Sequence, residues 1–195
     1  MLSKQQRMAT YFVLKTLAIS FGATTFLSAP ARADVSGEKS VYLVSKSGEE
    51  TKVATLNFSK NATGSSYKLE YDYSKFEEHF LSMRPFKCLQ TSAQMLCHLA
   101  YPYKSRHAIS KDDLQDLEYD FLYIHKAPGE YGINFWNGIY YKISQKPDGT
   151  FEGILMETDM DVLASPPEDY TRPITHGALN ENEDGKHFYP KMLIK

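Results

Sequence analysis

The chain contains 195 residues and carries a formal net charge of −2, from 22 basic and 24 acidic side chains. It has no basic run, so its composition argues against nucleic acid or an anionic membrane surface as a partner. Its length predicts one domain with enough residues to build a hydrophobic core. The 14 tyrosines and the frequent glycine-containing turns favour strands over helices.

Residues 1–33 have the pattern of a cleavable signal peptide. Lys4, Arg7 and Lys15 give a basic start, and a mostly apolar run that is short for a membrane span follows. Ala31-Arg32-Ala33 supplies a small-x-small cleavage pattern. An uncleaved membrane anchor is the alternative for this segment.

Cleavage would leave residues 34–195 as a single β-rich globular domain with 18 basic and 24 acidic residues. No later stretch approaches the length of a membrane span, so we expect no span after cleavage. The segment predicts a protein of the periplasm or a secreted protein.

The first strands are predicted from alternation of apolar and polar side chains. Residues 40–46 and 52–58 form a predicted hairpin around a turn at residues 47–50. Residues 61–66 have the composition of a loop. In residues 67–73, tyrosine and leucine alternate with charged side chains, as in a half-buried strand.

A capping-box pattern at Ser74–Glu77 predicts a short helix over residues 75–82. Phe76 and Phe80 would lie one turn apart on that helix. Pro85 excludes a long continuation.

The only two cysteines, Cys88 and Cys97, lie symmetrically about a polar turn at residues 91–94. This spacing predicts a β-hairpin in which residues 88–90 face residues 95–97 and the cysteines oppose each other. Directly opposed residues have Cα separations that a disulfide can span, so we expect a structural disulfide in an oxidising compartment. Free buried thiols are the alternative, because eight intervening residues fit neither C-x-x-C redox chemistry nor a zinc knuckle.

This register also predicts which hairpin residues share a face of the sheet. One face would carry Phe86, Cys88, Gln90, Met95, Cys97, Leu99 and Tyr101, and the other Leu89, Leu96 and His98.

Residues 110–124 fit two patterns. Ser110 and the acidic residues after it offer a helix start, whereas residues 117–125 alternate at period two as a strand does. We expect one or two helical turns followed by a strand. A longer helix over residues 110–124 is the alternative, since its apolar residues also fit one helical face.

The remaining turns predict further antiparallel strands. Asn137-Gly138 is the usual signal of a type I′ hairpin. Pro147-Asp148-Gly149 predicts a turn between strands at residues 139–145 and 150–162, and residues 192–194 predict a last strand.

Frequent turns and few helix signals predict a mainly β fold. We expect an antiparallel curved sheet or a small barrel of about eight strands, with one or two short helices. An α+β arrangement is the alternative.

Aromatic residues after the cysteine hairpin and around the Asn-Gly dipeptide are candidate ligand-binding residues. Aromatic faces with polar tips bind sugar rings and flat apolar ligands. A tyrosine-rich edge of the core is the alternative. The candidates are Tyr101, Tyr103, Tyr131, Phe135, Trp136 and Tyr140.

Metal chemistry has one candidate in the sequence. Glu157, Asp159 and Asp161 alternate along a predicted strand and could share a Ca²⁺ ion. A solvated acidic face is the favoured interpretation, because three side chains on a flat strand converge poorly. The six histidines have no recognisable ligand spacing, so the sequence predicts no zinc site and no cofactor.

Catalysis has few candidate residues, and we lean against an enzyme. Ser105-Arg106-His107 is the only close Ser/His group, and it lacks the G-x-S-x-G turn that exposes a serine nucleophile. His98 or His107 would be the base of any hydrolytic reaction, with a distant carboxylate.

Four segments resemble uncharacterised secreted proteins of proteobacteria. They are Ser-Met-Arg-Pro-Phe-Lys-Cys (82–88), Cys-His-Leu-Ala-Tyr-Pro-Tyr (97–103), Tyr-Gly-Ile-Asn-Phe-Trp-Asn-Gly (131–138) and Met-Asp-Val-Leu-Ala (160–164). The resemblance covers most of the mature chain and implies a bacterial periplasm. It implies no activity, cofactor or catalytic residue.

The sequence thus leads to three functional hypotheses. The first is a periplasmic, non-enzymatic binding module for a small molecule, a glycan or an envelope component. The second is a structural or protein-interaction protein of the envelope, and the third is a hydrolase of unrecognised type. Nucleic acid is not an expected partner.

Overall fold

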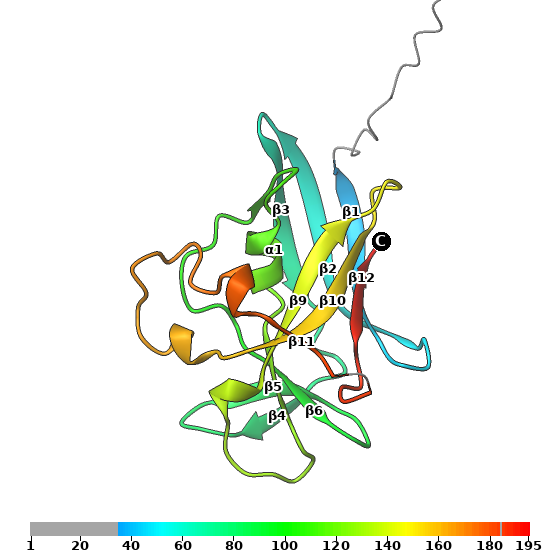
Figure 1. The fold of residues 1–195 in the computed structure, drawn as a ribbon. Helices are drawn as coiled ribbons and strands as arrows, with labels where there is room; N and C mark the ends of the chain where they lie inside the picture. The colour runs from blue at the N-terminus through cyan, green and yellow to red at the C-terminus, as the bar shows by residue number, and fades with distance from the viewer. Residues whose placement is uncertain (1–34, 184) are drawn as a thin grey trace, which may run out of the picture.

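A computed structural model describes residues 35–183 and 185–195. The predicted signal peptide lies outside the described residues. Within them, the strands form one strongly curved antiparallel sheet, and a short helix lies against it (Figure 1).

Short strands connected by tight turns dominate the described part of the chain. The strands are β1 (Gly37–Val44), β2 (Glu50–Asn61), β3 (Gly64–Tyr71), β4 (Glu77–Phe80), β5 (Pro85–Gln90), β6 (Met95–His98), β7 (Ala108–Ile109), β8 (Tyr123–Lys126), β9 (Gly138–Gln145), β10 (Phe151–Thr158), β11 (Asn180–Glu181) and β12 (Lys191–Ile194). The helical segments are α1 (Gln115–Tyr119) and the 3-10 turns η1 (Phe135–Asn137), η2 (Asp161–Leu163) and η3 (His176–Ala178). None of the helices in these residues has the length and apolar character needed to cross a bilayer.

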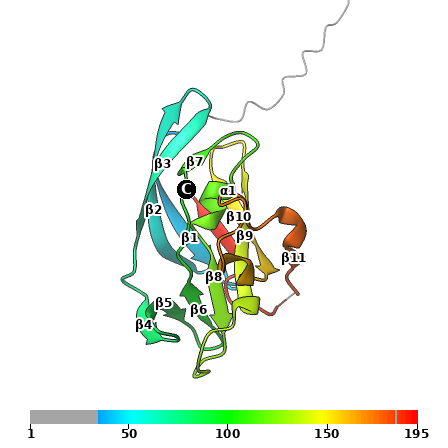
Figure 2. The same cartoon turned by 90° about the vertical axis from the view of Figure 1, so that its left-hand side faces the viewer.

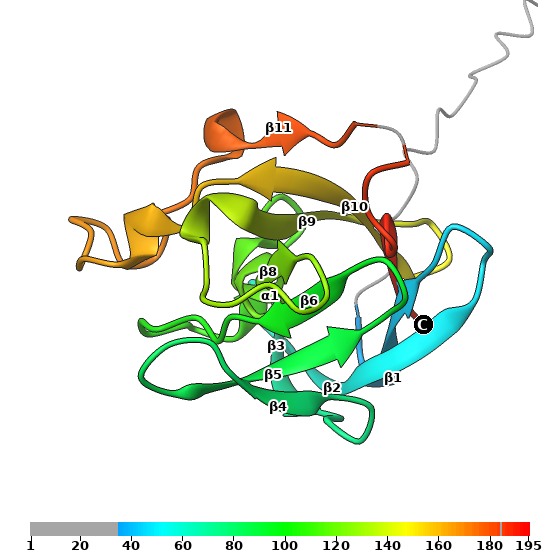
Figure 3. The ribbon, with the colours of Figure 1, turned by 90° about the horizontal axis from the view of Figure 1, so that it is seen from below.

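The sheet has the order β4-β5-β6-β8-β9-β10-β12-β1-β2-β3-β7, and β11 pairs separately with β10. Most neighbours are consecutive in the sequence, but the C-terminal β12 lies between β10 and β1 (Figure 1). Seen from below, the strands curl around α1 without closing, because β4 and β7 at the two ends do not pair (Figure 3). The mainly β prediction is confirmed in its curved-sheet form.

Two hydrophobic clusters occupy the two faces of the sheet. The first lies inside the curve and includes Val41, Leu43, Leu56, Leu89, Leu96, Phe121, Tyr141 and Phe151. The second lies on the other face and includes Phe86, Cys88, Met95, Cys97, Leu99, Tyr140, Met160 and Ile174. Alternate residues of β5 and β6 therefore enter different clusters, as the hairpin register predicted, although Gln90 is exposed.

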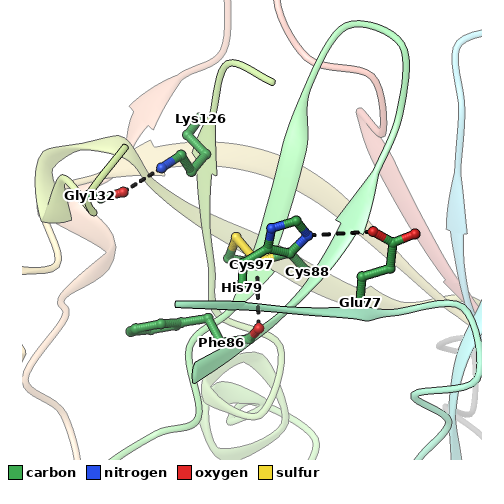
Figure 4. The surroundings of a disulfide bond; sticks show 7 residues. All are labelled: Glu77, His79, Phe86, Cys88, Cys97, Lys126 and Gly132. Carbon is green, nitrogen blue, oxygen red and sulfur yellow. Dashed lines mark hydrogen bonds and ion pairs between the residues drawn. A yellow bond between two sulfur atoms is a disulfide. The ribbon is translucent and has the colours of Figure 1, made fainter. Parts of the chain in front are cut away.

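The cysteine hairpin has the predicted register. Cys88 opposes Cys97, Leu89 opposes Leu96 and Gln90 opposes Met95. The two cysteines form a disulfide that is fully buried in the second cluster (Figure 4). The prediction of a disulfide is confirmed.

The prediction of a helix over residues 75–82 is wrong. Residues Glu77–Phe80 form β4, which pairs antiparallel with β5 at the end of the sheet. An isolated helix of two turns is marginal in water, whereas β4 gains backbone hydrogen bonds from a strand already fixed by the disulfide.

Residues 110–124 contain a short helix and then a strand. The helix α1 has five residues, and β8 begins only at Tyr123, so the strand is shorter than predicted and the longer helix is wrong. Residues 116–124 are all buried, because α1 and the residues after it are enclosed by the sheet (Figure 2). Continuous burial removes the alternation on which the two patterns depend.

The type I′ hairpin predicted at Asn137-Gly138 is also wrong. Asn137 ends η1, and Gly138 has a φ of −73° as it enters β9, so no left-handed residue is needed there. The turn at residues 147–149 is confirmed, but β10 ends at Thr158, before the predicted end at residue 162.

Loss of the disulfide should destabilise the protein. Closing a loop of ten residues contributes about 2.5–3 kcal/mol by the chain-entropy estimate. Urea denaturation of the Cys88→Ala/Cys97→Ala variant should show a loss of this size, and reduction of the wild-type protein should give a similar loss. Equal urea midpoints for the variant and the oxidised wild type would contradict the assignment.

Gly138 should be intolerant of a side chain for steric reasons. A Cβ there would overlap the Met160 side chain and the Thr158 carbonyl. Gly138→Ala should cost about 1–3 kcal/mol in thermal or urea unfolding, the usual penalty of overpacking. The matched control is Gly177→Ala, since its Cβ would meet nothing closer than Thr175 Oγ1 at 3.9 Å. A similar effect of both substitutions would show that crowding is not the cause.

Candidate functional site

A hollow lined by tyrosine and histidine rings lies where β3, β6 and the end of α1 meet. Its volume is about 280 Å³. We call it the tyrosine–histidine pocket. Its lining residues are Leu69, Tyr71, Tyr73, His98, Ala100, Tyr101, Tyr103, Ser105, His107 and Asp120.

The alternation in β3 explains one wall of the pocket. Tyr71 and Tyr73 lie two residues apart, so their rings project to the same face and stack at 5.1 Å between centroids. The His98 ring packs on Tyr71 at 4.1 Å between centroids, and its Nδ1 lies 2.9 Å from the Tyr73 hydroxyl. The wall is a stack of three rings fixed by one polar contact.

His98 offers a polar atom without a well-formed partner. Its Nε2 is buried and makes no hydrogen bond within residues 35–183 and 185–195. Burial lowers the pKa of His98 to about 4, and the nearby backbone of Asp120 offsets only part of this shift. The imidazole is therefore neutral at physiological pH.

Asp120 supplies the carboxylate of the pocket. It follows α1 directly and is 8% exposed. The Tyr67 hydroxyl donates to its Oδ2 at 2.6 Å, and His107 Nδ1 lies 3.4 Å from the same oxygen. Burial raises the pKa of Asp120, although Tyr67 and His107 counteract the rise. The Tyr71 hydroxyl donates to the Asp120 carbonyl, which fixes this turn against β3.

His107 has the one left-handed backbone conformation outside glycine in the described part of the chain, with φ at 47°. Its backbone N–H donates to Ser105 Oγ at 3.1 Å, and its carbonyl accepts from the Tyr67 N–H at 2.9 Å. Such conformations cost free energy and concentrate at functional sites. The strain holds a half-exposed imidazole at the rim of the pocket, beside Asp120.

Tyr101 and Tyr103 form the opposite side of the pocket. Their rings pack edge to face at 5.7 Å between centroids, and Tyr101 also stacks on Tyr119. The Tyr103 hydroxyl donates to the Leu163 carbonyl at 2.9 Å, and the Tyr101 hydroxyl donates to the Tyr170 carbonyl. Backbone carbonyls of the segment from residue 163 to residue 170 thus hold both hydroxyls in place.

Two arginines attach this side of the pocket to α1. Arg106 and Arg172 both form ion pairs with Asp113 and with the buried Asp116. Burial alone would raise the pKa of Asp116, but the hydrogen bonds from both arginines outweigh it and lower the pKa. The network joins residues distant in sequence around one carboxylate.

The predicted aromatic candidates do not form one group. Tyr101 and Tyr103 line the tyrosine–histidine pocket, whereas Tyr140 is fully buried and donates a hydrogen bond to Glu118. The other three lie on or before η1, away from this pocket: Phe135 is partly buried, Trp136 is 71% exposed and Tyr131 is 91% exposed.

The three acidic candidates are also separated by the end of β10. Glu157 lies in β10 and bonds to His187. Asp159 and Asp161 are exposed beyond the strand, where Asp159 Oδ1 accepts the Asp161 N–H at 2.8 Å. This hydrogen bond is an Asx turn that begins η2.

Tyr71, Tyr73 and Asp120 line the pocket but were not identified as site residues from the sequence, whereas His98 and His107 were named only as candidate bases. The alternation in β3 indicated that Tyr71 and Tyr73 share a face, and His98 was assigned to the face of Leu89 and Leu96. Asp120 carries no local signal, because its position depends on how α1 packs inside the sheet.

The comparisons with known proteins give no relative. No protein-family model matches the chain, and no curated protein or solved structure matches it either. The geometry of the site is therefore the basis for a function.

The lowered pKa of His98 predicts a pH dependence of stability. The unfolded state binds the proton below about pH 6.5 and the folded state only below about pH 4, so stability should fall as the pH drops between these values. The loss should reach about 3 kcal/mol by this linkage. His98→Gln keeps an acceptor for Tyr73 and removes the titration, so urea unfolding at pH 7 and pH 4.5 should show a smaller loss in the variant. Parallel pH profiles of the two proteins would refute the assignment.

Proposed function

We propose that the protein is a non-enzymatic binding module of the bacterial periplasm. Its ligand is a compact, hydroxyl-bearing ring, such as one sugar residue of an envelope glycan. The observation that carries this proposal is the tyrosine–histidine pocket, with ring faces on two sides and polar atoms between them.

The size of the pocket supports a small ligand. A volume of about 280 Å³ corresponds to about nine water molecules at ~30 Å³ each. It lies just below the range of pockets that enclose drug-sized molecules. A single sugar ring matches this volume better than a lipid chain or a folded peptide.

The chemistry of the lining supports a ligand that is both flat and polar. The Tyr71–Tyr73 stack and the Tyr101–Tyr103 pair present aromatic surface. The half-exposed imidazole of His107, beside the Asp120 carboxylate, supplies hydrogen-bonding atoms at the rim of the pocket. Sugar rings combine apolar C–H faces with hydroxyl groups, so they match both features.

Three features support the compartment. The Cys88–Cys97 disulfide requires an oxidising environment to form and persist. The predicted signal peptide in residues 1–33 supports export, and the resemblance to secreted proteobacterial proteins supports the periplasm.

A hydrolase is the second candidate, because His107 and Asp120 form an imidazole–carboxylate pair at the rim of the pocket. Such a pair activates a nucleophile when a hydroxyl or a water lies next to the imidazole. Ser105 Oγ, however, accepts the backbone N–H of His107. Nothing in the geometry of the described residues places this hydroxyl on the imidazole itself, so binding is the simpler function.

Binding should be measured by two-dimensional NMR with glucose, galactose and N-acetylglucosamine as probes. At least one sugar should shift resonances of the pocket, and Tyr103→Ala should weaken its affinity by about tenfold or more through loss of aromatic contact. Tyr131→Ala is the matched control, since Tyr131 is 91% exposed outside the pocket. Native mass spectrometry of protein from a periplasmic extract should also detect a retained small molecule.

Two results would overturn the binding proposal. The first is the absence of pocket shifts with every sugar, together with no retained mass. The second is turnover of an ester or glycoside substrate that His107→Ala abolishes, which would replace it with the hydrolase.

A further inference from the structure

Three side chains with metal-binding atoms lie together outside the tyrosine–histidine pocket. They are His125 of β8, Glu157 of β10 and His187 just before β12. One ligand atom from each lies within 4.8 Å of the other two. The sequence spacing of the histidines gave no sign of this group.

The strand register explains why His125 and Glu157 meet. Tyr123 of β8 and Glu157 of β10 pair with Ile139 from opposite sides, so their side chains share a face of the sheet. His125 lies two residues after Tyr123 and therefore shares that face. The segment before β12 adds His187, and it is anchored where the Leu155 N–H donates to the Pro190 carbonyl at 3.1 Å.

We propose that His125, Glu157 and His187 bind a divalent transition-metal ion, for which Zn²⁺ is the best match. Two imidazoles and one carboxylate are a known donor set for zinc sites that keep a fourth position for water or another ligand. Ca²⁺ is a poor match because it requires six to eight oxygen ligands. A solvent-reachable fourth position is consistent with the partial exposure of His125 and Glu157.

The closest pair of donor atoms needs only a small rearrangement to bind an ion. His187 Nε2 and Glu157 Oε1 are hydrogen-bonded at 2.7 Å. Two tetrahedral ligands at ~2.0–2.2 Å from zinc lie about 3.3 Å apart, so these two atoms must separate by only about 0.6 Å. Lys186, whose Nζ lies 3.0 Å from the same carboxylate oxygen, is 45% exposed and can move into solvent when the ion replaces its charge.

Gln94 controls the proton on His187. Its Oε1 accepts the Phe188 N–H at 2.9 Å, so its Nε2 must donate to His187 Nδ1 at 2.8 Å. The imidazole proton then lies on Nε2 and is donated to Glu157. An ion at Nε2 requires that this proton leave and that another be taken up at Nδ1, with no net change in protons bound.

The protonated Nδ1 would then face the Nε2 group of Gln94, so the amide of Gln94 must turn and lose its bond to Phe188. Metal-bound histidines usually donate their second N–H to a carboxylate or a carbonyl. In a Gln94→Glu variant, the carboxylate could accept from both His187 Nδ1 and the Phe188 N–H. This substitution should therefore strengthen zinc binding.

The test is titration with Zn²⁺ by calorimetry and with Co²⁺ by visible absorption. The wild-type protein should bind one ion of either metal, and Zn²⁺ should displace Co²⁺. Glu157→Gln and His125→Ala should each weaken the affinity by more than about tenfold, and Gln94→Glu should strengthen it by about 10–100-fold, the usual size of such outer-ligand effects. Lys186→Ala should bind at least as tightly as the wild type.

The control is His79→Ala, which removes a histidine remote from this group in sequence and outside it in space. Unchanged affinity in this variant, with losses at His125 and Glu157, supports the site. Equal affinity of the wild type and Glu157→Gln would show adventitious ion binding only, and weaker binding by Gln94→Glu would refute the proton assignment. Urea midpoints followed by Trp136 fluorescence check that each variant is folded.

Discussion

The pairing of β12 with both β10 and β1 is the constraint on which the rest of the structure depends. It joins β1, β2, β3 and β7 to the strands from β4 to β6 and from β8 to β10, so that all of them belong to one sheet that can curve around one core. Ser40 and Lys195 exchange both backbone hydrogen bonds at this junction. The last residues of the chain therefore close contacts with the first described strand, and such distant contacts slow the formation of a β fold.

The sequence predicted those features that depend on neighbouring residues. The register of the cysteine hairpin followed from the symmetry of Cys88 and Cys97 about a turn, and the distribution of β5 and β6 between two clusters followed from the register. The helix predicted from Ser74 failed because pairing with β5 determines that segment, and Gly138 is required for space rather than for a turn. The position of β12 had no local signal.

The candidate sites also depend on contacts between distant residues, which the sequence does not predict. Tyr101 and Tyr103 were predicted to bind ligand and do line the pocket, but their partners come from β3, β6 and the residue after α1. Likewise, His125 and His187 are 62 positions apart in the sequence. The order of β8, β9 and β10 brings His125 to Glu157, and the pairing of β10 with β12 brings His187 there. Sequence spacing identifies sites formed within one segment, whereas both of these sites are formed by the sheet.

An open sheet leaves two free edges, and β4 shows how this chain protects one of them. Within the described residues its outer edge is unpaired and offers backbone hydrogen-bonding groups to any other strand, and its last residue, Phe80, is 70% exposed. Glu77 and Glu78 are exposed on the same four-residue strand. A second copy docking along this edge would have to bury these charged side chains, including the ion pair of Glu78 with Lys87 at 2.6 Å, and natural proteins use charged edges in this way against aggregation. The charged edge should therefore protect the folded protein from self-association at neutral pH.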